Sequence, residues 1–212
     1  MPLTPLLPSV QPMAYRSAPS AETRGKLATR RASLTLRDAM TEASRAAGDV
    51  AIADAINLLL AQRLAPGAIV ALYAEKGSEV ATGLIDAAAR AAGFLVAYPR
   101  VVARAVALTF HEVAREQLAA SRFGLREPSA DIAPVALDEI SAFVVPGLAF
   151  DRDGGRIGWG QGHYDATFAA AAPSALRVGL GYDCQLVDHV EREPHDVALH
   201  FIITEVATLA VA

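Results

Sequence analysis

The sequence predicts an α/β fold in which parallel strands alternate with helices. Residues 68–73 form a continuous apolar run, which is typical of a strand covered on both faces. A helical stretch follows at 82–92, and a second apolar run at 94–98. Strand, loop, helix and strand within about thirty residues form the usual βαβ unit. With 212 residues, of which 53% are hydrophobic and 20% charged, the chain can bury a sizeable core.

The first part of the chain predicts a leader and two helices. Residues 1–20 contain prolines at positions 2, 5, 8, 12 and 19, so we expect a disordered leader before a single domain at 21–212. The leader lacks the charged start and the uninterrupted apolar segment of a secretory signal. One helix is expected over 21–47, where basic residues are frequent, and a second over 50–64, ended by Pro66 and Gly67.

The rest of the chain continues the alternation of strands and helices. We expect Thr82 to cap the helix at 82–92, and we expect Pro146 and Gly147 to stop a buried strand. No run approaches the roughly 18 apolar residues of a membrane span, so no membrane partner is expected. The predicted segments are a strand pair within 99–113, a strand at 143–145, a turn at 153–155, a helix at 164–172 and strands at 177–181 and 199–204.

Residues 156–165, RIGWGQGHYD, form the stretch with the clearest chemical meaning. Glycine stands at every second position of its centre, which lets backbone N–H groups approach a ligand closely. A helix predicted to begin near His163 would turn its unpaired N–H groups toward the same place, as a phosphate requires. Arg156 offers a planar fork of donors, and Asp165 is an oxygen ligand suited to Mg²⁺. The pattern alone also allows a mobile glycine hairpin with a surface arginine and a helix-capping aspartate.

A longer motif surrounds this stretch. Residues 146–151 read PGLAFD and lead through Gly154 and Gly155 into the ten residues just described. This wording resembles the signature of the 5-formyltetrahydrofolate cyclo-ligases, and the resemblance extends from about residue 21 to residue 204. It implies a three-layer αβα fold with a mostly parallel sheet, similar to the NagB/RpiA/CoA-transferase-like architecture. It also implies ATP- and Mg²⁺-dependent conversion of 5-formyltetrahydrofolate to 5,10-methenyltetrahydrofolate, ADP and phosphate.

The resemblance also implies roles for individual residues. Arg156 and Tyr164 would act in catalysis, and Asp165 and Asp196 would hold Mg²⁺. The folate would contact Glu79, Ala74 and Trp159. The residues expected at the nucleotide are Arg24, Arg156, Gly158, Trp159, Gly160, Gln161, Gly162, His163 and Tyr164.

Four positions depart from the family pattern. Ser20 replaces a lysine of the basic N-terminal helix, so one phosphate contact is missing unless Lys26 supplies it from another angle. Trp159 stands where other members vary. Gln161 replaces a lysine or a glycine, and His163 replaces an aromatic residue. Of these changes, only those at positions 20 and 161 affect the charge near phosphate.

Composition limits the partners. A net charge of -4 argues against a general nucleic-acid binder, and the one cysteine, Cys184, suits a reducing compartment, so we expect a cytoplasmic protein. The histidines lack zinc-site spacing. The expected partner is 5-formyltetrahydrofolate, with or without a polyglutamate tail, bound by a monomer or weak homodimer. Two alternatives are a non-catalytic folate- or nucleotide-binding paralogue and an enzyme acting on sugar phosphates or CoA.

Overall fold

The computed structural model describes residues 21–121, 124–193 and 196–211, without the side chains of residues 21–24. The predicted leader at 1–20 lies outside this description. A seven-stranded sheet of order β11-β10-β9-β6-β1-β2-β3 forms the centre. Its strands are β1 (Ile69–Ala71), β2 (Leu95–Arg100), β3 (Thr109–Glu112), β6 (Ile140–Pro146), β9 (Leu176–Leu180), β10 (Phe201–Ile203) and β11 (Thr208–Ala210).

The sheet is parallel except at its two edges. Strands β10, β9, β6, β1 and β2 run in the same direction, and β3 and β11 pair antiparallel at the ends. The expected α/β fold with a mostly parallel sheet is therefore confirmed, as is the βαβ unit made by β1, α3 (Gly83–Ala91) and β2. Edge strand β11 was not predicted.

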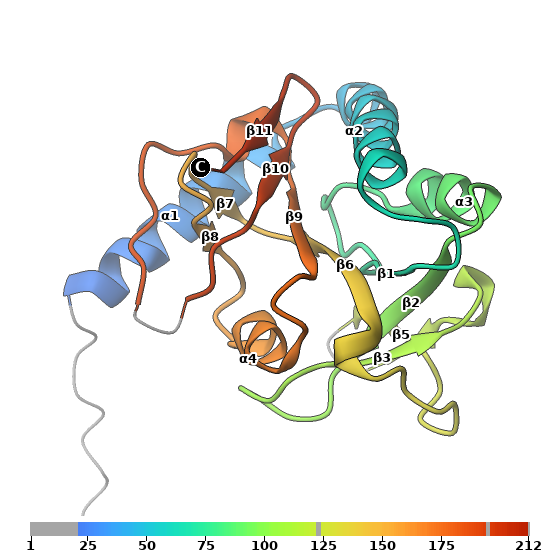
Figure 1. Cartoon of the computed structure of the whole chain (residues 1–212). Helices are drawn as coiled ribbons and strands as arrows, with labels where there is room; N and C mark the ends of the chain where they lie inside the picture. Colours follow the sequence, from blue (N-terminus) through green and yellow to red (C-terminus); the bar gives the residue numbers. More distant parts are fainter. Residues whose placement is uncertain (1–20, 122–123, 194–195, 212) are drawn as a thin grey trace, which may run out of the picture.

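Helices cover both faces of the sheet (Figure 1). Helices α2 (Glu42–Arg63) and α3 lie on one face, where Ile52, Ile56 and Ile85 pack in a cluster with inward side chains of the strands. Helix α4 (His163–Ala170) lies on the other face, where Phe168 and Phe143 meet edge to face. This arrangement gives the three layers that the resemblance implied.

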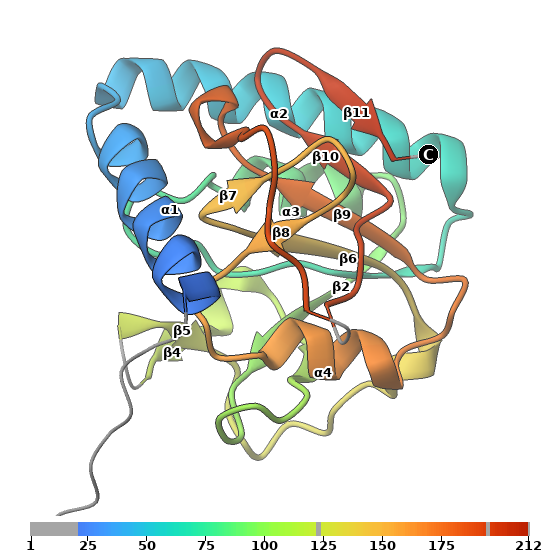
Figure 2. The same cartoon turned by 90° about the vertical axis from the view of Figure 1, so that its left-hand side faces the viewer.

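Helix α1 (Ala21–Asp38) does not belong to either layer. It lies across one end of the sheet beside β7 (Ala149–Phe150), as Figure 2 shows. Strand β7 forms a small hairpin with β8 (Arg156–Ile157), which contains the turn predicted at 153–155. The other short elements are the pair β4 (Ala119–Ala120) and β5 (Arg126–Glu127) and the 3₁₀ turns η1 (Arg115–Gln117), η3 (Leu137–Glu139) and η4 (Asp183–Gln185).

Two sequence predictions about the helices are wrong. The helix expected over 21–47 ends at Asp38, and the next helix, α2, begins at Glu42 rather than near Val50. Thr41 caps α2, because its hydroxyl accepts a hydrogen bond from the Ser44 N–H at 3.1 Å. The first turns of α2 contain few large apolar residues, so the apolar periodicity did not indicate this start. Thr82 occupies the N-cap position of α3, but its hydroxyl donates to the Tyr73 carbonyl at 2.7 Å instead of capping the helix.

Phe150 sets the path of the chain after the central strand β6. Its side chain is fully buried, and a Cβ added at Gly147, Gly179 or Gly181 would lie only 2.4, 2.6 or 2.8 Å from its ring. Real Cβ atoms do not come this close, so the ring fills space that only glycine leaves. The hairpin of β7 and β8 is therefore packed directly over the ends of β6 and β9.

We predict that Gly179→Ala destabilises the protein by about 1 to 3 kcal/mol, because the new methyl group overpacks the space that Phe150 and Leu199 fill. Denaturant unfolding measures this change. The matched control is Gly83→Ala, whose Cβ would lie at an ordinary 3.6 Å from Arg115. Phe150→Leu in the Gly179→Ala background should recover part of the loss, and equal stability of the two glycine variants would contradict the packing argument.

Candidate functional site

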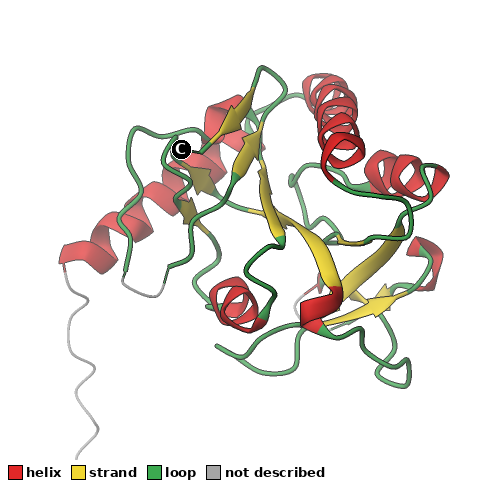
Figure 3. Cartoon of the chain, viewed as in Figure 1, coloured by secondary structure: helices red, strands yellow, loops and turns green. Residues whose placement is uncertain are grey.

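The candidate site lies where the direction of the sheet connections reverses. Strand β1 leads through α3 to β2 on one side, whereas its neighbour β6 leads to β9 on the other. In open α/β sheets, ligands bind at the carboxyl ends of strands at such a switch point. Long loops gather there (Figure 3), and those at 72–82 and 158–162 come together, since the Trp159 indole N–H donates to Glu79 Oε1 at 3.2 Å.

Two guanidinium groups lie against the glycine-rich loop. Arg30 of α1 donates from Nε to the Gly158 carbonyl at 2.9 Å, and a Cβ at Gly160 would lie 3.1 Å from its Nη2. On the other side, a Cβ at Gly158 would lie 3.0 Å from Arg156 Nη1. The alternate glycines thus leave room for guanidinium groups beside the loop, and the approach of its N–H groups to a ligand stays a prediction. Arg30 was missed, although its spacing of four residues from Lys26 already placed both cations on one helix face.

The loop runs into the N-terminus of α4, which begins at His163 as predicted. Gly162 is the N-cap residue in the left-handed conformation, with φ 71°, and no side chain caps the first turn. The loop is also tied to the segment at 101–108: the Ala105 N–H donates to the Gln161 carbonyl at 3.0 Å, and His163 Nδ1 lies 3.1 Å from the Val106 carbonyl. Among the described residues, the backbone N–H groups in the first turn of α4 therefore have no side-chain cap beside the loop.

Arg156 contacts two residues of the first turn of α4, Tyr164 and Asp165. The Arg156 side chain is only 9% exposed, lies 3.7 Å from Asp165 Oδ1 and covers the Tyr164 ring at 5.1 Å from its centroid. Burial raises the pKa of the Tyr164 hydroxyl, and Arg156 only partly opposes this effect. Tyr164 therefore remains protonated at neutral pH and is a hydrogen-bond donor rather than a base.

Asp196, the other predicted metal ligand, lies beside a different cation. It accepts a hydrogen bond from the Glu193 N–H at 2.7 Å and pairs with Lys26 of α1 at 3.3 Å. Burial alone would lower the pKa of Lys26, but hydrogen bonds and charge from Glu193 and Asp196 raise it overall. In the described part of the chain, no three His, Cys, Asp or Glu side chains gather into a metal-binding group. The side chain of Arg24 lies outside the described residues.

Two open hollows border α1 at this end of the sheet. The first, of about 250 Å³, is lined by Gly25, Lys26, Thr29, Ile157, His189 and Glu191. The second, of about 200 Å³, is lined by Leu34, Arg37, Asp38, Lys76, Gly77, Ser78 and Trp159. The glycine-rich loop begins directly after Ile157 of the first hollow and contributes Trp159 to the second, so both spaces border the beginning of the loop.

Glu79 is a buried acid beside the second hollow. It is 8% exposed, and its Oε2 accepts a hydrogen bond from the Lys76 N–H at 2.9 Å. Burial raises the pKa of Glu79, while the hydrogen bonds from Lys76 and Trp159 oppose the rise. Ala74, the other predicted folate contact, is half-buried in the same loop.

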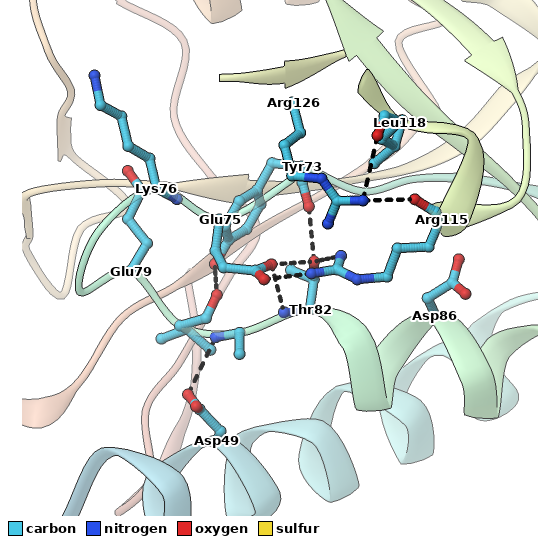
Figure 4. A network of polar contacts seen from close by, with 12 residues as sticks. Asp49, Tyr73, Glu75, Lys76, Glu79, Thr82, Asp86, Arg115, Leu118 and Arg126 are labelled. Atoms are coloured by element: carbon cyan, nitrogen blue, oxygen red, sulfur yellow. Dashed lines mark hydrogen bonds and ion pairs between the residues drawn. The ribbon is translucent and has the colours of Figure 1, made fainter. Parts of the chain in front are cut away.

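A polar network fixes this loop against α3 (Figure 4). Arg115 forms an ion pair with Glu75 and donates to the Thr82 hydroxyl at 3.0 Å, and the Thr82 N–H donates to Glu75 at 3.2 Å. Burial alone would raise the pKa of Glu75, but Arg115 and two backbone N–H groups lower it overall. Sequence reasoning missed Arg115, because nothing near it in the chain indicates a distant carboxylate.

The fold and the site together define an α/β protein with a glycine-rich loop flanked by cationic side chains at a topological switch point. The sequence model of the 5-formyltetrahydrofolate cyclo-ligase family matches residues 20–205, and the chain belongs to that family.

Individual relatives agree with this assignment. Curated 5-formyltetrahydrofolate cyclo-ligases of Mycolicibacterium smegmatis and Haemophilus influenzae are 42% and 38% identical over 88 and 85 residues, covering 41% and 39% of this chain. The Escherichia coli K12 protein is 31% identical over 111 residues, or 51% of this chain. The chain spans about half the length of these relatives, 45%, 46% and 60% respectively.

Solved structures share the fold. A 5,10-methenyltetrahydrofolate synthetase from Mycoplasma pneumoniae superposes with a TM-score of 0.70 at 22% identity, over 85% of this chain and 98% of that one. The enzyme of the same name from Aquifex aeolicus gives a TM-score of 0.75 at 24% identity, over 88% and 92% of the two chains. Likeness at this level of identity establishes the architecture.

We predict that Glu75→Gln lowers the free energy of unfolding by about 1 to 2 kcal/mol at neutral pH, because Arg115 loses a charged partner. The pKa of Glu75 is lowered in the folded state, so its contribution is present above its ordinary pKa of 4.5 and is lost as the pH falls through the folded value. Urea unfolding as a function of pH measures this difference. Glu116→Gln, an exposed neighbour, is the control, and a pH-independent gap between wild type and Glu75→Gln would contradict the expectation.

Proposed function

We propose that the protein catalyses the ATP- and Mg²⁺-dependent cyclisation of 5-formyltetrahydrofolate to 5,10-methenyltetrahydrofolate, with release of ADP and phosphate. Membership of the cyclo-ligase family supports this proposal. The observation that carries it is that two sets of contacts meet at the glycine-rich loop. Arg156 contacts Tyr164 and Asp165 beside this loop, and Trp159 within the loop donates a hydrogen bond to Glu79. Groups suited to a nucleotide and a group suited to a folate thus meet at one switch point.

The reaction needs activation of a formamide oxygen, which is a poor leaving group. In the proposed path, the formyl oxygen attacks the γ-phosphorus and the bond to ADP breaks. N10 of the folate then attacks the formyl carbon and loses its proton, and phosphate leaves with the formyl oxygen. The protein mainly has to hold the two partners in line and to stabilise the charge on the transferring group.

Individual side chains have distinct tasks in this proposal. Arg156 and the amides of residues 158–162 bind the phosphates, and the protonated Tyr164 donates a hydrogen bond near the transferring group. Glu79 binds the folate, with Ala74 and Trp159 at its border. Arg30 adds a second guanidinium at the loop and takes the place of the cation missing at Ser20 and Gln161.

The carboxylates present fit a magnesium ion of the kind that accompanies a nucleotide. Mg²⁺ usually keeps several waters and takes one or two protein carboxylates together with phosphate oxygens, so a cluster of three acids is unnecessary. Asp165 would hold it beside Arg156, and Asp196 would approach from the loop that Lys26 contacts. When bound, the ion supplies neutralisation of the phosphate charge. We further propose a cytoplasmic monomer or weak homodimer that accepts folates with or without a polyglutamate tail.

The test is to mix the protein with 5-formyltetrahydrofolate and Mg-ATP and to follow the absorbance of the methenyl product. Product formation that requires both ATP and Mg²⁺ is expected. A protein that binds the folate in calorimetry but forms no product would instead be a non-catalytic binder with the same fold.

We predict that Arg156→Ala lowers kcat/KM by a factor equivalent to about 2 to 4 kcal/mol, because one buried donor to the transferring group is lost. Steady-state kinetics measure the change. Arg152→Ala removes the same charge from an exposed position in the neighbouring turn and should leave the rate nearly unaltered. A near-normal rate for Arg156→Ala would remove this residue from its role.

We predict that Arg30→Ala raises the KM for ATP about tenfold with little change in the KM for the folate, because one charged donor at the glycine-rich loop is lost. Arg31→Ala is the matched control, since the adjacent arginine is exposed on the same helix. Equal kinetics for the two variants would show that the contact between Arg30 and the loop has no part in nucleotide binding.

A further inference from the structure

Trp159 connects two loops that are far apart in the sequence. It is the only tryptophan of the chain and stands between Gly158 and Gly160. Although the residue is 49% exposed, its indole N–H donates to Glu79 Oε1 at 3.2 Å, and the Lys76 ammonium lies 5.8 Å from the centroid of its ring. An exposed aromatic side chain is thus held in one orientation by a buried acid.

The hydrogen bonds at Glu79 leave it able to bind a further ligand. Oε2 accepts from the Lys76 N–H and Oε1 accepts from Trp159, so each oxygen uses one acceptor site within the part of the chain that the structure describes. An ionised carboxylate has about four such sites, so one remains on each oxygen. A planar ring with two adjacent N–H donors, as in a 2-amino-4-oxopyrimidine, matches that pair. The hollow of about 200 Å³ shares both Lys76 and Trp159 with these contacts.

We propose that Trp159 is a positioning residue that acts through Glu79: its indole N–H fixes the carboxylate that receives the N–H donors of the folate heterocycle. The same hydrogen bond joins the glycine-rich loop, which we propose binds the nucleotide, to Glu79, which we propose binds the folate. This inference rests on the proposed function for the identity of the ligand. The contact between Trp159 and Glu79 can be tested without any ligand.

The protonation of Glu79 follows from the groups that face it. These are Lys76 of its own loop, Arg37 of α1, Tyr73 at the end of β1 and Tyr164 of α4. Burial raises the pKa of Glu79, and the indole N–H is one of the groups that oppose the rise. Loss of the indole N–H therefore moves this pKa further up, and Glu79 is then protonated, with fewer acceptor sites, at a higher pH.

The first experiment uses the fluorescence of the single tryptophan during a pH titration of the protein alone. We expect a change in emission with a midpoint above 4.5, the ordinary pKa of glutamate, as Glu79 gains a proton. The change should be absent in Glu79→Gln. The same transition in Glu79→Gln would overturn the proposal, whatever the outcome of the activity assay.

The second experiment compares Trp159→Phe, which keeps an aromatic ring and removes the N–H, with wild type. We expect about a tenfold higher KM for 5-formyltetrahydrofolate, and an acid limb of kcat/KM displaced to higher pH. Leu84→Ala, an exposed apolar residue of α3, is the control that should change neither. If Trp159→Phe has the same KM and the same pH profile as wild type, the proposal is wrong.

A double-mutant cycle shows whether the effect passes through Glu79. In a Glu79→Gln background, Trp159→Phe should lower kcat/KM by less than about twofold. A loss as large as that in wild type would mean that Trp159 acts elsewhere, and the proposal would be wrong. Failure of wild type to form product would count against the proposed function, and the fluorescence titration would still decide the role of Trp159.

Discussion

The packing of Phe150 against three glycines is the constraint on which the site depends. Because the ring occupies the space above Gly147, Gly179 and Gly181, the chain leaving β6 turns back as a hairpin. The next residue, Asp151, is 1% exposed and accepts hydrogen bonds from the N–H groups of Gly155 and Val190 at 2.6 and 2.8 Å. One buried ring and one buried acid thus bring Arg156, the glycine-rich loop and the segment at 188–193 to the same end of the sheet.

A buried arginine holds helix α1 in place. Arg37 is 1% exposed and donates to the Ser78 hydroxyl at 2.9 Å and to the Gly147 carbonyl at 3.3 Å. A charge without partners would be costly at such burial, so α1 is held across the exits of both β1 and β6. This position places Arg30 and Lys26, about two and three turns closer to the N-terminus of the helix, next to the loops of the site.

The site carries local positive charge although the chain is acidic overall. Arg30 and Arg156 flank the glycine-rich loop, where Asp165 pairs with Arg156, and both Glu193 and Asp196 pair with Lys26. Such pairs restrict long side chains before a ligand arrives, which reduces the entropy lost on binding. A net charge of -4 is therefore compatible with a site for phosphate.

The sequence by itself determined the parallel strands, the start of α4 at His163 and the family, because each depends on residues close together in the chain. It did not determine where α1 ends, since one polar cap at Thr41 decides that break. Arg30, Arg37 and Arg115 acquired their roles only in the tertiary structure, through partners 128, 41 and 40 residues away. Local patterns report the conformation of a segment, whereas the partner of a long cationic side chain is decided by which loops the sheet brings to the same edge.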